Sequence, residues 1–168
     1  RPQWNTLSAQ VAPLLPDQSR KVYLGPGNNY PRAGKGKATV STNDWVQVFF
    51  EEDGYLLVQY AISRHQYRIG YIKADAVSNL SEVAEIGSWA NYPAQVLRTS
   101  ALTDDPLNSC GAVMTLTAGQ QVTYLGQLGQ EWAFVETTTA QGQRIRGFVE
   151  LSELNVTRPD DADDNLNG

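Results

Sequence analysis

Apolar and polar residues alternate along most of the chain in short runs separated by turn residues. Residues 45–50 form an aromatic and β-branched run, the acidic residues 51–54 follow, and residues 55–60 form a second apolar run. The Asp53-Gly54 pair between these runs is typical of a β-hairpin. Periodicity of the helical kind is nearly absent. The pattern therefore predicts an all-β chain built from short strands.

The same meander of strands recurs with an offset of 77 residues. The residues that match in this register are Tyr55 with Trp132, Val58 with Val135, and Gly70-Tyr71-Ile72 with Gly147-Phe148-Val149. An ungapped internal repeat of this length predicts two copies of one small domain. In a barrel of about 60 residues each strand has few inward positions, so we expect the aromatic residue and the valine to fill the interior. The glycine would let another backbone segment pass close by.

Turn residues and local composition divide the chain into five segments. We expect an extended N-terminal arm at residues 1–19, a first barrel at 20–80, a linker at 81–93, a second barrel at 94–157 and a disordered acidic tail at 158–168. The linker contains Trp89 and Tyr92, which make it too apolar for a free tether. The two barrels are therefore predicted to pack against each other at the linker.

Charge and length narrow the classes of partner. The chain has 168 residues, a formal net charge of −5 and a sequence pI near 4.8, which disfavours binding to nucleic acid. It has no apolar run of about 18 residues, so we expect no membrane insertion. The chain begins with Arg1-Pro2 and its only methionine is Met114. We therefore expect that an N-terminal segment has been removed, either as a signal peptide or by excision from a longer protein.

The repeats resemble bacterial SH3 domains, which occur in many secreted and cell-wall-associated bacterial proteins. The residues that carry the resemblance are the opening Val22-Tyr23-Leu24-Gly25-Pro26-Gly27 and the closing Gly70-Tyr71-Ile72 and Gly147-Phe148-Val149. The second copy opens with residues 96–99 and lacks the Gly-Pro turn. The resemblance implies two tandem SH3-like small β-barrels packed through a short linker, and a ligand groove between the first long loop and the third strand.

Residues that could carry catalysis are few. His65 is the only histidine and Cys110 the only cysteine, and they lie in different repeats. A nucleophilic pair would have to meet within about 3 Å after folding, so we expect no catalytic site and no cofactor. Asp163, Asn165 and Asn167 match the first half of a calcium loop, but the glutamate that completes such a loop is missing, so no metal site is predicted. Residues 51–53 lie on a hairpin turn, where solvated charge is expected.

The first copy has more aromatic residues than a small barrel can bury. Exposed aromatic rings near arginine suit flat or extended ligands, such as peptides and sugars. The alternative is that these rings pack against the linker or the N-terminal arm. The candidate ligand-binding residues are Tyr23, Tyr30, Arg32, Trp45, Tyr60 and Tyr67.

These observations predict a non-catalytic binding protein of the bacterial cell envelope or the extracellular space. Its expected partner is peptidoglycan, another cell-wall polymer or a wall-associated peptide. The alternative is an extracellular protein–peptide interaction or sensor domain of a larger protein. The acidic residues of the second copy would then suit a basic partner; they are Asp104, Asp105, Glu131, Glu136 and Glu150.

Overall fold

The fold is known from a computed structural model, which describes residues 10–11, 19–34, 37–41, 46–77, 83–104 and 112–159. The described residues form β-strands joined by turns and short 3₁₀ helices, which confirms the all-β prediction. No described helix has the length and apolar character needed to span a membrane. The predicted arm (apart from residues 10–11 and 19) and the tail beyond residue 159 lie outside the described residues.

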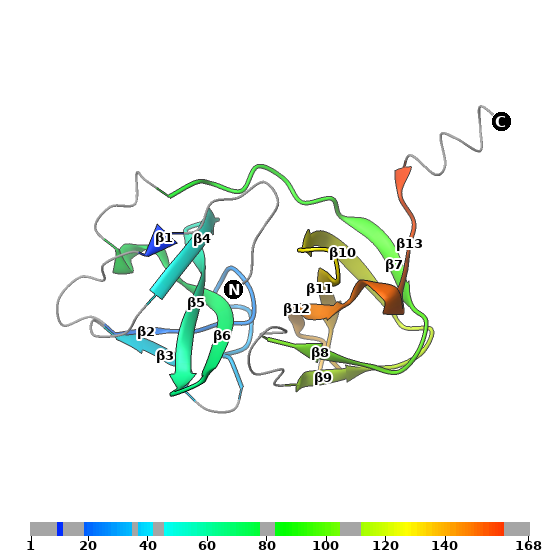
Figure 1. Cartoon of the computed structure of the whole chain (residues 1–168), viewed down its shortest axis with the longest axis horizontal. Helices are drawn as coiled ribbons and strands as arrows, with labels where there is room; N and C mark the ends of the chain where they lie inside the picture. Colours follow the sequence, from blue (N-terminus) through cyan, green and yellow to red (C-terminus); the bar gives the residue numbers. More distant parts are fainter. Residues whose placement is uncertain are drawn as a thin grey trace.

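The strands form three antiparallel sheets (Figure 1). The four-stranded sheet has the order β1-β4-β5-β6 and consists of β1 (Gln10–Val11), β4 (Val46–Glu52), β5 (Tyr55–Ser63) and β6 (Gln66–Lys73). The two-stranded sheet pairs β2 (Ser19–Lys21) with β3 (Thr39–Ser41). These two sheets, with the 3₁₀ helix η1 (Ala74–Ala76), make up what we call the first half, residues 19–77.

The seven-stranded sheet makes up the second half, residues 92–157, and has the order β13-β7-β10-β11-β12-β8-β9. Its strands are β7 (Tyr92–Val96), β8 (Ser100–Thr103), β9 (Ala112–Leu116), β10 (Gln121–Leu128), β11 (Trp132–Thr138), β12 (Arg144–Glu150) and β13 (Leu154–Val156), and η3 (Leu151–Glu153) precedes β13. No sheet closes into a barrel within the described ranges, so the finer prediction of two closed SH3-like barrels goes beyond what this structure shows.

The β4–β5 hairpin forms at the predicted Asp-Gly turn. Asp53 has φ +52° and Gly54 has φ +81°, and both values are the left-handed conformation that a two-residue hairpin turn requires. Asn, Asp and Gly adopt this conformation at the lowest steric cost, which explains why this pair separates the two apolar runs.

The offset of 77 residues in the sequence recurs in the pairing of the strands. Val58 is opposite Gly70 in the first half, and Val135 is opposite Gly147 in the second. The strands β6 and β12 both lead directly into a 3₁₀ helix, η1 or η3, at equivalent positions. The internal repeat is therefore a repeat of strand register as well as of residue type.

The two repeated glycines permit a close approach, as the sequence predicted. A Cβ atom on Gly70 would lie 2.5 Å from Val22 Cγ1, and one on Gly147 would lie 2.8 Å from Leu102 Cγ. Both distances are shorter than a carbon–carbon contact allows. The glycine in each half thus makes room for the segment that crosses β6 or β12.

An apolar cluster joins the two halves. It contains Phe49, Phe50, Leu57, Ile69 and Tyr71 from the first half, and Leu125, Leu128, Phe134 and Phe148 from the second. Trp89 of the linker packs against this cluster, with ring centroids 5.4 Å from Phe50 and 5.5 Å from Phe134. The other linker aromatic, Tyr92, stacks on Tyr124 within the second half. Of the two linker aromatics, Trp89 alone therefore contacts both halves.

Candidate functional site

The six predicted ligand-binding residues do not form one surface. Tyr60 is fully buried, and its hydroxyl donates to the Lys37 carbonyl and accepts a hydrogen bond from Arg68. Tyr30 is also buried. The rings of these two tyrosines are thus part of the interior and are closed to a ligand in this structure.

The remaining predicted residues lie nearer the surface of the first half. Tyr23 is half-buried and its ring packs edge-on against Tyr55, with centroids 6.1 Å apart. Arg32 is exposed and forms a backbone bridge with Tyr23, while its guanidinium donates to the Ala38 carbonyl. Tyr67 is half-buried on β6, and Trp45 lies outside the described residues. The structure therefore brings Tyr23 and Arg32 together, and their role in binding stays a prediction.

The second half occupies the place where the resemblance put the ligand groove. Tyr30 of the first long loop and Tyr71 of β6 both face Arg146 of β12, whose guanidinium carbon lies 5.7 Å and 5.8 Å from their ring centroids. The Tyr30 hydroxyl donates to Glu136 Oε2 at 2.8 Å. An internal contact thus fills the space between the first loop and the third strand.

Arg146 is the centre of a network of polar groups between the halves. Its Nη1 donates to both Glu52 oxygens, at 2.9 Å and 3.1 Å, and its Nε donates to Glu136 Oε2 at 2.8 Å. Only about a tenth of the Arg146 and Glu52 side chains is exposed. Burial lowers the pKa of Arg146, but Tyr71 and the two glutamates outweigh it and leave the pKa raised. The guanidinium therefore stays charged at every physiological pH.

Aromatic side chains complete this network. The Tyr71 hydroxyl accepts from Arg146 Nη1 and donates to Glu52 Oε1, both at 3.0 Å, and the Trp89 indole donates to Glu52 Oε2 at 3.1 Å. Burial raises the pKa of Tyr71 well above its usual value. We call Tyr30, Glu52, Tyr71, Trp89, Glu136 and Arg146 the junction network. The expectation that all the charges of residues 51–53 are solvated is thus wrong for Glu52, whose carboxylate is buried and paired.

A second buried ion pair crosses between the halves. Arg68 Nε donates to Asp104 Oδ2 at 2.8 Å, and neither side chain is more than about a tenth exposed. Burial raises the pKa of Asp104, and Arg68 offsets only part of that effect. Asp104 and Glu136 are therefore committed to arginines of this chain, which removes them from the acidic surface that was predicted to suit a basic partner. Asp105 lies outside the described residues.

Two backbone hydrogen bonds link the halves in a reciprocal way. The Ile69 amide donates to the Asp104 carbonyl at 2.9 Å, and the Arg146 amide donates to the Leu24 carbonyl at 2.8 Å. Ile69 and Arg146 are 77 residues apart, and Leu24 and Asp104 each follow the residue that bridges to β6 or β12. Each half thus uses the same edge to receive the other.

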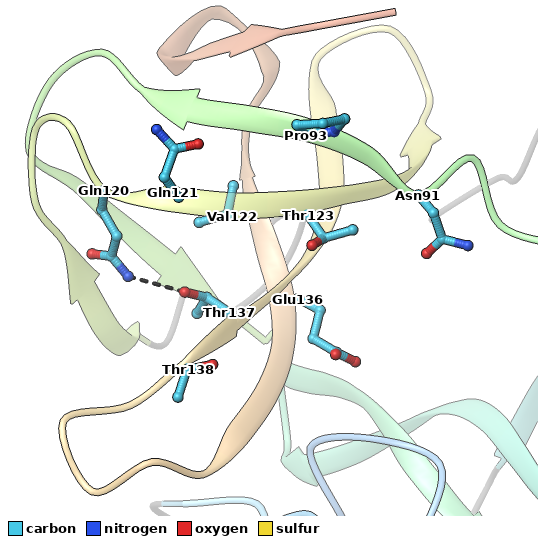
Figure 2. A pocket seen from close by; sticks show the side chains of 9 residues that line it. All are labelled: Asn91, Pro93, Gln120, Gln121, Val122, Thr123, Glu136, Thr137 and Thr138. Atoms are coloured by element: carbon cyan, nitrogen blue, oxygen red, sulfur yellow. Dashed lines mark hydrogen bonds between the residues drawn. The ribbon is translucent and has the colours of Figure 1, made fainter. Parts of the chain in front are cut away.

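The face of the seven-stranded sheet carries an open groove of about 480 Å³ (Figure 2). It arises because β10 and β11 separate: their pairing ends at Thr123 and Glu136, beyond which β10 continues with β7 and β11 with β12. Gln120 Nε2 donates to Thr137 Oγ1 at 3.0 Å across the gap (Figure 2). The lining residues are Asn91, Pro93, Gln120, Gln121, Val122, Thr123, Glu136, Thr137 and Thr138.

Glu136 belongs to both the groove and the junction network. It lines the groove, and its side chain points toward the first half (Figure 2). The network holds its Oε2 through Tyr30 and Arg146, while its Oε1 lies 3.6 Å from the more exposed Arg144. One end of the groove is therefore fixed by the contact between the halves.

Two further depressions are acidic. One is lined by Glu51, Glu52, Asp53 and Glu85 together with residues 86–89, and the other by Glu131 and Glu150 beside η3. In the described ranges, no group of three or more histidine, cysteine, aspartate or glutamate side chains is arranged to hold a metal ion. His65 is exposed on the β5–β6 turn, and Cys110 and residues 160–168, including the partial calcium motif, lie outside the described residues.

Reasoning from the sequence missed both the junction network and the groove. The one available signal for the network was Arg146 itself, a charged residue within a strand that otherwise repeats the buried residues of β6. The groove left no signal, because it depends on where two strands separate. Comparison with known proteins adds nothing to these features: no protein-family model matches the chain, and no curated protein matches it.

Proposed function

We propose that this chain is a non-catalytic, cofactor-free binding protein of the bacterial cell envelope or extracellular space, and that it binds peptidoglycan or a wall-associated peptide through the groove between β10 and β11. The resemblance of its repeats to bacterial SH3 domains supports the compartment and the class of partner. The repeat of strand register supports the proposal of two related SH3-like units.

The observation that carries the proposal is the composition of the groove. Eight of its nine lining residues are uncharged, and six of those eight carry an amide or a hydroxyl group. Such side chains exchange hydrogen bonds with polar polymers, and pockets of roughly 300–1,000 Å³ are typical of ligand sites. The rigid junction beside the groove keeps these groups in place without a ligand, which lowers the entropic cost of binding.

Co-sedimentation with purified bacterial cell walls tests this function. We expect the chain to sediment with the walls at physiological salt, and a Thr138→Trp variant, which fills the groove, to stay in the supernatant. Thr115→Trp is the matched control, because Thr115 is an exposed strand residue on β9 away from the groove. If the unaltered chain does not sediment above an unrelated acidic protein, the proposed function is wrong.

A second candidate, binding of a basic peptide by an extracellular interaction domain, is favoured by the acidic depression next to Trp89. A peptide array separates the two candidates. Binding to lysine- and arginine-rich peptides that weakens steeply with salt, together with no binding to walls, would select the second candidate.

A further inference from the structure

The charge of the groove is already balanced by the protein. Glu136 is the one ionisable side chain among the lining residues, and Tyr30 and Arg146 hold its Oε2. Glu52 and Glu136 together carry two negative charges, and Arg144 and Arg146 carry two positive charges. A ligand with a net charge would therefore gain little from this groove and would lose its hydration.

The uncharged lining residues have hydrogen-bonding capacity to spare. Gln121, Thr123 and Thr138 line the groove, and their side chains make no hydrogen bond to another described residue. An amide and a hydroxyl group each offer both a donor and an acceptor. Sugar hydroxyl groups also donate and accept, so a row of them matches these side chains without any requirement for charge.

The backbone around the groove does not favour an added peptide strand. Strand addition needs a continuous strand edge along which a peptide can extend. Here β10 and β11 diverge after Thr123 and Glu136, and the hydrogen bond from Gln120 to Thr137 closes the gap at its far end (Figure 2). Recognition in this groove therefore depends on side chains and not on the pairing of main chains.

We propose that the groove recognises the glycan part of the wall polymer, as a short uncharged sugar chain held by Gln121, Thr123 and Thr138. This inference rests on the proposed function, because it names which component of the wall is bound. Along β10 the groove extends from Thr123 to Gln120, a length of about 10 Å at the usual rise of a strand. A site of that length suits a short oligosaccharide.

Titration calorimetry with short N-acetylglucosamine oligomers tests the inference on the full chain. We expect binding whose affinity changes less than twofold when NaCl rises from about 0.05 to 0.5 M, since no net charge is exchanged. Thr123→Val and Thr138→Val each remove one hydroxyl group and should weaken binding about three- to tenfold. Thr115→Val removes a hydroxyl from an exposed strand position elsewhere and should leave the affinity unchanged.

The other outcomes separate this inference from the proposed function. If intact walls bind and a synthetic wall peptide competes while the sugar oligomers do not, the glycan assignment is overturned and wall binding stands. If the oligomers bind but the two groove variants bind as well as Thr115→Val, the position of the site is wrong. If neither the walls nor the oligomers bind, both proposals fail.

Discussion

Arg146 and Glu52 lie 94 residues apart in the chain, yet Nη1 of the arginine is within 3.1 Å of both oxygens of the glutamate. Each residue belongs to a different half, and both side chains are about nine-tenths buried. This ion pair gives the contact between the halves its specificity, because an arginine at that place is satisfied only if Glu52 and Glu136 arrive in the correct position.

Replacing Arg146 with alanine should destabilise the whole chain. The substitution leaves the Glu52 and Glu136 carboxylates without their main partner in a site with little water, which costs about 3–5 kcal/mol in the free energy of unfolding. Urea denaturation followed by tryptophan fluorescence measures the effect. Arg98→Ala is the matched control, because the ion pair of Arg98 with Glu153 is on the surface and its loss should change stability little.

Alkaline pH should weaken the fold through Tyr71. Burial raises the pKa of its hydroxyl well above the usual value of 10, so in the window above pH 10 the folded chain keeps a proton that the unfolded chain releases. The stabilisation is therefore complete below pH 10 and is lost as the pH rises above it. Thermal unfolding between pH 8 and about pH 11 measures this decline.

Tyr71→Phe removes the titrating group and tests the cause of that decline. The variant should be less stable at neutral pH by about 1 kcal/mol, since it loses the hydrogen bonds with Glu52 and Arg146. Its stability should then fall less steeply than that of the unaltered chain as the pH rises above 10. Parallel curves for the two proteins would show that another group causes the alkaline loss.

Alanine at Gly147 should cost stability through crowding. The new Cβ would lie 2.8 Å from Leu102 Cγ and 3.1 Å from the Thr103 carbonyl oxygen, and forced contacts of this kind typically cost about 1–3 kcal/mol. Gly87→Ala is the control, because a Cβ at Gly87 meets nothing within 4 Å. Equal melting temperatures for the two variants would contradict the close approach at β12.

Trp89→Ala should loosen the contact between the halves. The ring packs against Phe50 on one side and Phe134 on the other, so its loss opens a cavity between them and lowers the free energy of unfolding by roughly 3 kcal/mol. Backbone ¹⁵N relaxation reports whether the halves then tumble independently. Tyr92→Ala is a useful comparison, since Tyr92 stacks within the second half and its loss should leave joint tumbling intact.

The strands were predictable because they depend on local signals. The Asp53-Gly54 turn and the repeated Gly-aromatic-β-branched triplet fix hairpins and register over short distances. The junction was not predictable, because the partners of Arg146 come from residues 10 and 94 positions away. Tyr30 and Tyr60 were read as surface rings for the same reason: their burial depends on the second half and on long-range contacts with Glu136, Lys37 and Arg68.

The reciprocal bonds from Ile69 to Asp104 and from Arg146 to Leu24 also protect the chain from unwanted assembly. An open strand edge is a template onto which other chains can add, and natural β-proteins cover such edges. Here β6 and β12 each have their outer edge covered by a carbonyl group of the other repeat. Cutting the protein into single repeats would expose both edges at once, so the pair is the smallest unit that resists aggregation.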